Sequence, residues 1–292
     1  MALVSVLWGV ALLSIIAASF LSAGNTSYRL ARSGLDVAQD DAIAEGVVNR
    51  AVLGLVDITP ERRWRADGAA QSIDFAGARA RISIQDELGR IDINQADGGP
   101  LASLFVSIGL DAQQASKLVD KILDWRSSGE LKRLNGAKAR DYRTAGGSYR
   151  PRNGPFQSLD ELKLVIGMNP RLFNRIVPAL TVYSGRPFID PKVAPPEALR
   201  ALPGMDSGKI ASILEAREER AVGPAGPAEL ATAQVGRAFT VHAEMERSDR
   251  ATVYEAVIRL TGNAAEPYLM LNWKRVGAPS RDDAASAHLT PP

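Results

Sequence analysis

The stretch MALVSVLWGVALLSIIAASFLSA, residues 1–23, contains no charged side chain. A helix of roughly 20 apolar residues is long enough to cross the hydrocarbon core of a bilayer. A cleavable secretory signal would instead have a basic start, a shorter apolar part and a small-residue cleavage site. The sequence therefore predicts a transmembrane helix over residues 1–23, with the bulk of the protein on one side of the membrane.

The helix is predicted to continue past the membrane, because residues 27–56 contain no proline and show helical periodicity. One side of this segment is apolar and consists of Leu30, Leu35, Val37, Ile43, Val47, Val48 and Val52. The other side is polar and consists of Ser27, Arg29, Arg32, Asp36, Asp40 and Asp41. The simplest interpretation is one continuous helix of about 50 residues, with its first half in lipid and its second half packed on a soluble domain. The alternative is a single-span anchor followed by a separate helix.

Two groups of strands are predicted on either side of a long middle segment. Apolar and polar residues alternate, as strands require, in Gln71–Phe75, Ala78–Gln85, Phe239–Glu246, Thr252–Leu260 and Tyr268–Val276. The first two form a hairpin around Gly77, and Arg90–Asn94 adds a strand-like end to the first group. About 140 residues between the groups look helical or loop-like. We therefore expect both groups to pair into one antiparallel sheet that is split by an insertion.

The predicted fold class is α+β, with a long N-terminal helix packed on an antiparallel sheet and a large all-α domain inserted between strands. The expected division begins with a transmembrane helix over residues 1–23 and a first part of the sheet domain over residues 24–94. The inserted domain follows over residues 95–235, and the second part of the sheet domain covers residues 236–277. Residues 278–292 are expected to be a disordered tail.

The insertion carries a weak internal repeat of apolar helix, glycine turn and second apolar helix. The three copies are Leu101–Leu123, Leu159–Leu180 and Leu199–Arg217, with turn glycines Gly109, Gly167 and Gly204. Such units resemble the helix-hairpin-helix motif, whose turn N–H groups hold a phosphate in DNA-binding proteins. The alternative is that they are packing units of a helical subdomain. Packing is favoured, because Asp111 and Asp206 follow two of the turns and would repel a phosphate.

The composition excludes several classes of chemistry. The chain has no cysteine, which rules out thiolate metal sites, cysteine nucleophiles and disulfides, and it has only two histidines, His242 and His288. A phosphate-binding loop with lysine and a G-x-S-x-G elbow are both missing from the sequence. The carboxylate pairs are adjacent in sequence, so their side chains do not face each other for acid–base work. We therefore expect a protein that is not an enzyme and that has no catalytic residue.

Residues 126–152 form a basic stretch that reads as a long loop. Two acidic residues, Glu130 and Asp141, stand against eight basic ones: Arg126, Lys132, Arg133, Lys138, Arg140, Arg143, Arg150 and Arg152. The stretch is either a solvated loop or a contact with an acidic neighbouring subunit, for which charge would supply specificity and encounter rate.

A series of motifs resembles one known family. In order they are the apolar N-terminal helix, DELGRIDIN at 86–94, LDW at 123–125, GAKARDY at 136–142, NGPFQSLDELKLVIGM at 153–168 and PALTVY at 178–183. This order is similar to the general secretion pathway protein K family, the minor pseudopilin K of type II secretion systems, over residues 1 to about 275. The run NGPFQSLDEL before TVY is its most specific part.

The resemblance implies a pilin-like fold with a large inserted helical domain. It also implies a single pass through the inner membrane with the soluble part in the periplasm, at the tip of the secretion pseudopilus. The implied partners are the minor pseudopilins I and J, with pseudopilin H, the major pseudopilin G and the secreted substrate as further candidates. Nucleic acid is not among them. The leading alternatives are a membrane-tethered helix-hairpin-helix protein that binds DNA in an uptake system, and a minor pilin of a type IV pilus.

The resemblance further implies processing at the N-terminus. Family members are cut by a prepilin peptidase, and the new N-terminus is methylated, so Met1 is the expected processing and N-methylation site. Most pilins carry a glutamate at mature position 5 that pairs with a neighbour's N-terminal amine. Here Ser5 stands in its place. A subunit without this acid does not need to accept a neighbour's amine, which suits the tip of a filament.

The resemblance also bears on calcium, because some family members have acidic residues after the tryptophan and in the loop of residues 126–152, where they are similar to calcium-binding proteins. Calcium takes about six to eight oxygen ligands, and the candidate ligands here are Asp124, Glu130 and Asp141. Lys138 stands where the family usually has a glutamate. We therefore expect no tight calcium site and no cofactor, with lysine and arginine supplying fixed positive charge in place of a metal.

Overall fold

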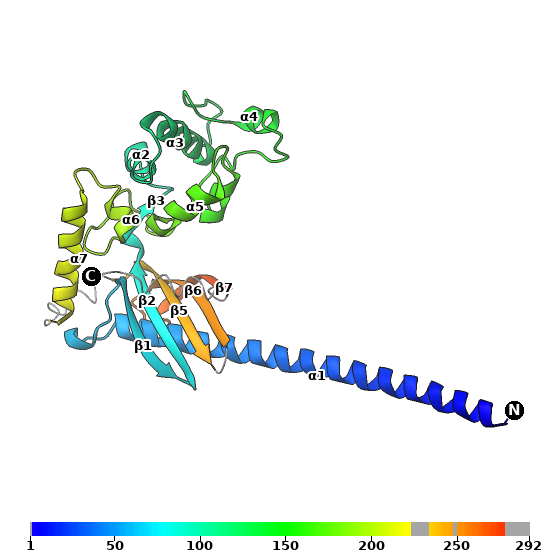
Figure 1. Ribbon diagram of the computed structural model, residues 1–292. Helices are drawn as coiled ribbons and strands as arrows, with labels where there is room; N and C mark the ends of the chain where they lie inside the picture. Colours follow the sequence, from blue (N-terminus) through cyan, green and yellow to red (C-terminus); the bar gives the residue numbers. More distant parts are fainter. Residues whose placement is uncertain (1, 223–233, 248–249, 278–292) are drawn as a thin grey trace.

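The computed structural model describes residues 2–222, 234–247 and 250–277. Side chains are described for all of these except residues 2, 17, 18, 20–26, 60 and 219–222. The fold is α+β, as predicted: one long helix packs on a five-stranded antiparallel sheet, and a long insertion separates two of the strands (Figure 1). Met1 and the predicted disordered tail, residues 278–292, lie outside the described residues.

Helix α1 (Ala2–Leu55) is a single helix of 54 residues, which confirms the continuous helix and contradicts the anchor-plus-helix alternative. Its C-terminal part packs on the sheet through buried residues that include Ile43, Val47 and Val52. Its N-terminal part projects beyond the sheet (Figure 1). The predicted apolar stripe is wrong at Leu30, Leu35 and Val37, which are exposed, and the predicted polar side is wrong at Asp40, which is buried. Leu30 and Leu35 are exposed because they lie on the part of the helix that projects beyond the sheet.

Within the described residues, no helix combines the length and the apolar character that a membrane span requires. The predicted transmembrane helix of residues 1–23 is therefore not confirmed. That segment includes residue 1 and the side chains of residues 2, 17, 18 and 20–23, which are outside the described set.

The sheet has the strand order β1-β2-β5-β6-β7, and every neighbouring pair is antiparallel. Its strands are β1 (Asp67–Phe75), β2 (Ala78–Asp86), β5 (Ala238–Arg247), β6 (Arg250–Leu260) and β7 (Tyr268–Val276). All five predicted strands and the pairing of the two groups are confirmed. Alternate residues such as Ala80, Ile82 and Ala243 pack in one core with α1, so the period-two pattern decides which face is buried.

The insertion between β2 and β5 contains short helices, 3₁₀ turns and one small sheet. Its elements are η2 (Glu87–Gly89), β3 (Ile91–Asp92), α2 (Gly98–Ser107), α3 (Ala112–Arg126), α4 (Ala139–Thr144), η3 (Leu159–Leu164), α5 (Pro170–Ile176), η4 (Val177–Ala179), β4 (Leu180–Thr181), α6 (Pro196–Leu199) and α7 (Ser207–Val222). A further 3₁₀ turn, η1 (Pro60–Arg62), follows α1.

The prediction of an all-α insertion is wrong, because β3 and β4 form a two-stranded parallel sheet. Ile91 pairs with Leu180 and Asp92 pairs with Thr181, so the predicted strand-like end at Arg90–Asn94 does not join the large sheet. The insertion has a hydrophobic core of its own, which includes Ile91, Phe105 and Leu180. We therefore propose that the domain boundary lies near residue 86, upstream of the predicted position at residue 94.

The three predicted glycine turns are present, since Gly109, Gly167 and Gly204 all have positive φ. Only the first turn joins two α-helices of substantial length, α2 and α3. The second begins with the 3₁₀ helix η3, and the third begins with α6, which has four residues. The helix-hairpin-helix character of the repeat therefore stays a prediction.

A polar neck joins the insertion to the sheet. Asp86, at the end of β2, forms an ion pair with Arg237, which directly precedes β5. The buried carboxylate of Glu87 accepts hydrogen bonds from Thr240 Oγ1 (2.6 Å) and Arg90 Nη1 (2.9 Å). Burial raises the pKa of the Asp86 carboxyl to about 6, although Arg237 acts in the opposite direction. The chain thus enters and leaves the insertion through one hydrogen-bonded cluster.

Candidate functional site

The basic stretch between α3 and η3 is an ordered, internally bonded segment. It contains the helix α4, so its prediction as a long loop is partly wrong. Five of its eight basic residues donate hydrogen bonds within the protein: Arg126, Lys132, Arg133, Lys138 and Arg152. Most of the positive charge therefore serves internal contacts, which weakens the hypothesis of a basic surface for an acidic neighbour.

Asp124 lies at the centre of this segment, and its side chain is fully buried. Its carboxylate accepts from Arg133 twice, from the guanidinium Nη1 at 2.7 Å and from the backbone N–H at 3.0 Å. A Cβ at Gly136 would overlap with Asp124 Oδ2, so only glycine fits this position. Asp124 is thus committed to the protein's own donors.

Lys138 is buried beside Asp124. Its ammonium donates to the carbonyl oxygens of Asp124 and Ser127, both at 2.8 Å, and to Asn153 Oδ1 at 3.3 Å. Asp141 accepts from the backbone N–H of Lys138 at 2.9 Å and from Lys132 Nζ at 2.8 Å. These donors hold the pKa of the Asp141 carboxyl below its usual value, chiefly through the hydrogen bond from Lys132.

The candidate calcium ligands do not fit a calcium ion. Asp124 and Asp141 are taken by guanidinium, ammonium and N–H donors, and Glu130 is exposed. In the part of the chain that the structure describes, three or more acidic, histidine or cysteine side chains nowhere gather around a possible metal position. Because calcium needs several free oxygen ligands, the sequence candidates do not form one site.

An aromatic cluster packs beside the segment, and apart from the motifs themselves no sequence pattern predicted it. Trp125 stacks on Phe156 with ring centroids 6.1 Å apart and meets Tyr142 edge-on at 5.6 Å. The indole Nε1 of Trp125 donates to Glu161 Oε2 at 3.2 Å, and Arg152 donates to both oxygens of Glu161. Burial raises the pKa of Tyr142 to about 12. The LDW and NGPFQSLDEL motifs therefore meet in one structural cluster.

The three glycine turns do not present free helix N-termini. Asp111 Oδ1 accepts from Gln114 N at 2.7 Å and caps α3. Asn169 Oδ1 accepts from Leu172 N at 2.9 Å, and Asp206 Oδ1 accepts from Lys209 N at 2.9 Å. A phosphate would have to displace these side-chain caps, two of which are carboxylates, so the turns are poor phosphate sites.

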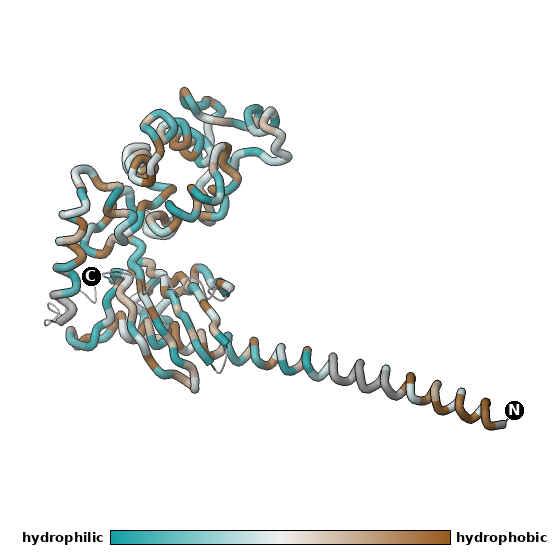
Figure 2. Tube along the Cα trace, in the orientation of Figure 1, coloured by the Kyte–Doolittle hydropathy of each residue, from teal (hydrophilic) through white to brown (hydrophobic). Residues whose placement is uncertain are grey.

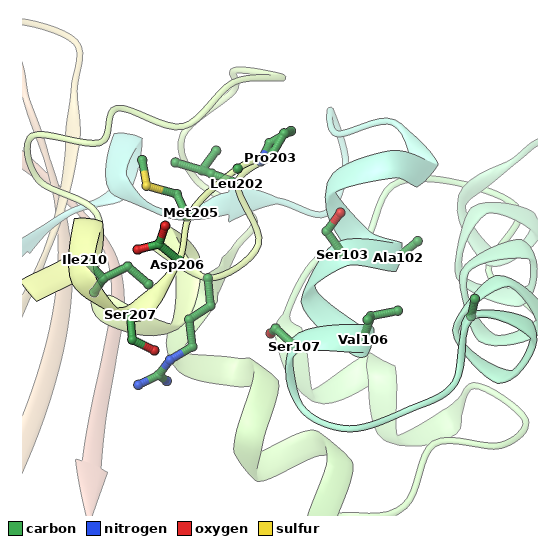
Figure 3. A pocket seen from close by; sticks show the side chains of 13 residues that line it. Ala102, Ser103, Val106, Ser107, Leu202, Pro203, Met205, Asp206, Ser207 and Ile210 are labelled. Atoms are coloured by element: carbon green, nitrogen blue, oxygen red, sulfur yellow. The ribbon is translucent and has the colours of Figure 1, made fainter.

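A shallow groove of about 680 Å³ lies between α2 and the turn that leads into α7 (Figure 3). Val106 and Ser103 line it from α2, and Met205 and Ile210 line it from the other side. Its charged lining residues already have protein partners, since Asp206 caps α7 and the Nη1 atom of Arg200 forms an ion pair with Oε1 of Glu197 at 3.9 Å. The groove offers a mixed contact surface rather than a set of reactive groups.

The projecting part of α1 carries the largest run of exposed apolar side chains, at the hydrophobic end of the helix in Figure 2. They are Leu3, Val4, Val6, Leu7, Trp8, Val10, Leu12, Leu13, Ile15 and Ile16. Ser5 is an exposed residue of the same segment, and Met1 lies outside the described residues. Exposed apolar surface of this extent marks a membrane or protein contact.

A second exposed apolar surface lies where α1 meets the edge strand β7. A groove here is lined by Ala38, Asp41, Ala42, Glu45, Tyr268, Met270 and Trp273. On β7, Leu269, Met270 and Leu271 are all exposed. Because β7 is the last strand of the sheet, its outer backbone groups are available to another chain.

Two comparisons with known proteins gave matches, one to a family model and one to a solved structure. Residues 85–185 match the family model described as "Type II secretion system (T2SS), protein K". The fold matches a chain of the crystal structure of the GspK-GspI-GspJ complex from the type 2 secretion system of enterotoxigenic Escherichia coli. That match has a TM-score of 0.59 and 11% sequence identity, and it covers 85% of this chain and 99% of that chain. A search of curated proteins found no match.

Proposed function

We propose that this chain, whose residues 85–185 belong to the type II secretion system protein K family, is a minor pseudopilin that helps to build the secretion pseudopilus. It acts as a non-enzymatic tip subunit for protein export across the outer membrane. The observation that carries the proposal is the joint occurrence of the protein K segment and a 54-residue helix with a free apolar half. The protein K match also favours a secretion pseudopilus over a type IV pilus.

The free half of α1 is the proposed anchor and assembly element. Its exposed apolar side chains would be stable in the inner membrane or against like helices of sister subunits, but not in water. The sheet and the insertion then lie in the periplasm. Prepilin peptidase processing and N-methylation at Met1 are part of the same proposal.

The tip position is supported by Ser5. A carboxylate at this point of a pilin helix would pair with the N-terminal amine of the next subunit, and Ser5 has no charge with which to do so. A subunit of this kind can occupy the tip of the filament. If another subunit were added above it, the N-terminal amine of that added subunit would find no carboxylate and would be unpaired in lipid.

The proposed partners are the minor pseudopilins I and J. The matched structure is described as a complex of GspK with GspI and GspJ, which supports an equivalent complex here. Pseudopilin H, the major pseudopilin G and the secreted substrate are further partners in this proposal, and the insertion is the part that faces the substrate.

The test is co-purification of the full chain, in detergent, with the minor pseudopilins I and J of the same organism. A stable ternary complex that elutes as one species is the expected result. Elution of the three proteins as separate species, with each of them folded, would contradict the proposal.

Two matched variants in α1 test the assembly element. Leu12→Asp places a charge in the exposed apolar run, and we expect it to remove the protein from the membrane fraction and to weaken secretion at least tenfold. Arg29→Gln changes an exposed polar residue of the same helix, and it should leave both the membrane association and the level of secretion unchanged. Equal behaviour of the two variants would show that the apolar run has no role in assembly.

The alternative of a DNA-binding uptake protein is disfavoured by the capped helix N-termini described above. A mobility-shift assay across a salt series separates the two functions. Binding that weakens steeply with salt would support DNA recognition, whereas our proposal expects no shift at physiological salt.

A further inference from the structure

The cage around Lys138 has the features of a cation site that is already filled by the protein. A lysine ammonium has three N–H donors. Here all three find oxygens, from Asp124 and Ser127 on one side of the loop and from Asn153 on the other. Lys138 itself is only 6% exposed, so water contributes little to its solvation.

The oxygens of the cage come from rigidly held positions. Ser127 is the C-cap of α3, and the backbone N–H of Asn153 donates to the carbonyl of Trp125 at 2.9 Å. Asn153 also adopts the left-handed conformation with φ of +54°, which an asparagine tolerates better than most residues. Two carbonyl oxygens and one amide oxygen, fixed in this way around one point, are hard ligands that suit a cation.

The neighbouring carboxylates are closed to an outside ion in the same manner. The Asp124 carboxylate forms an ion pair with the guanidinium of Arg133, and the Asp141 carboxylate forms one with the ammonium of Lys132. Positive groups of the chain therefore stand at two of the three candidate carboxylates of the loop, Asp124 and Asp141.

We infer that the ammonium of Lys138 is a built-in cation, which fills the cage of Asp124, Ser127 and Asn153 and orders residues 127–153 without any inorganic ion. Removing the ammonium takes one donor away from each of these three oxygens, and the Asp124 carbonyl keeps only the hydrogen bond from Ser127 N at 3.3 Å. The loss of these hydrogen bonds destabilises the segment. Replacing it by a carboxylate turns the same cage into a binding site for calcium. This inference does not depend on the role in secretion.

The experiment measures the thermal unfolding midpoint, Tm, of the full chain in detergent with calcium chloride or with a chelator. The wild-type Tm is expected to be the same in both. Lys138→Met should lower the Tm by about 5 °C in both. Lys138→Glu should show a low Tm in chelator that calcium raises by about 5 °C. Arg150→Glu makes the same charge change at an exposed position of the segment and should show no response to calcium.

Three outcomes would overturn the inference: a wild-type Tm that rises with calcium, a Lys138→Met variant as stable as the wild type, or a folded Lys138→Glu variant that ignores calcium. Limited trypsin cleavage of the wild type provides a measurement that needs no variant. Cleavage within residues 126–152 should proceed at the same rate with calcium and with chelator, and faster cleavage in chelator would also overturn the inference.

Discussion

At the residue scale, Asp86 shows how burial and an ion pair compete for one carboxyl group. The side chain is 2% exposed and pairs with Arg237, yet its pKa is raised to about 6. The loss of water around the buried carboxylate outweighs the attraction of the guanidinium and the hydrogen bond from Leu88 N (2.9 Å). The ionised Asp86 carboxylate in the neck therefore lowers the free energy of unfolding near neutral pH.

The raised pKa predicts a pH dependence with a definite sign. Between about pH 4 and pH 6 the folded protein binds a proton at Asp86 that the unfolded chain does not, so lowering the pH through this window increases the free energy of unfolding. Compared with Asp86→Asn, the wild type should gain about 2–3 kcal/mol between pH 7 and pH 4. Denaturant titrations at several pH values measure the difference. Parallel profiles for the two proteins would contradict the assignment.

The sequence predicted the character of the loop site but not its partners. Lys138 in place of an acid suggested fixed positive charge, and the structure places that charge at Nζ inside an oxygen cage. Two of the three cage oxygens are backbone carbonyls, which every residue has and no sequence pattern distinguishes. Asn153 lies 15 residues away from Lys138, so its contribution depends on the path of the whole segment.

At the element scale, the turn between α2 and α3 depends on one glycine. Gly109 has a φ of +98°, a region that residues with a Cβ rarely adopt, and no heavy atom would lie within 4 Å of an added Cβ. The need for glycine is therefore conformational rather than a matter of space.

Substitution of Gly109 tests this statement. Gly109→Ala should lower the free energy of unfolding by about 1–2 kcal/mol, because alanine is strained at positive φ. Gly109→Asn is the matched variant, and it should lose about half as much, since asparagine tolerates this region better. Denaturant unfolding of the three proteins should give free energies of unfolding that decrease in the order Gly, Asn, Ala. An alanine variant as stable as the wild type would refute the conformational explanation.

The elements of the large sheet could be predicted because each strand is long enough to show alternation. The pairing of β3 with β4 could not, because each strand has two residues and their partners are about 90 positions apart, Ile91 with Leu180. The exposure of Leu30 and Leu35 was missed for a related reason. Periodicity identifies the apolar side of a helix but not the point at which its packing partner ends.

At the scale of the whole molecule, the insertion occupies the position of a hairpin turn. Asp86 and Phe239 are direct partners in the β2–β5 register, although 152 residues separate them in sequence. The sheet also has its own core with α1, made of residues from both sides of the insertion. The two strands therefore stand as close together as the arms of an ordinary hairpin.

Excision of the insertion is a direct test of this arrangement. Replacing residues 87–238 by Asn-Gly, which favours a two-residue hairpin turn, should leave a folded chain with the five-stranded sheet. We expect cooperative thermal unfolding and a far-ultraviolet circular dichroism spectrum with strand signal, compared with the full chain under the same conditions. A shortened chain that shows no cooperative transition would mean that the sheet needs the insertion to fold.

The unbroken course of α1 makes it a lever. At 1.5 Å per residue, 54 residues form a rod of roughly 80 Å. A rod without a joint transmits angle as well as position, so a tilt of about 10° at its first turns would swing the far end by about 14 Å. A partner that binds the first turns of this helix therefore sets the orientation of the sheet and of the insertion attached to it.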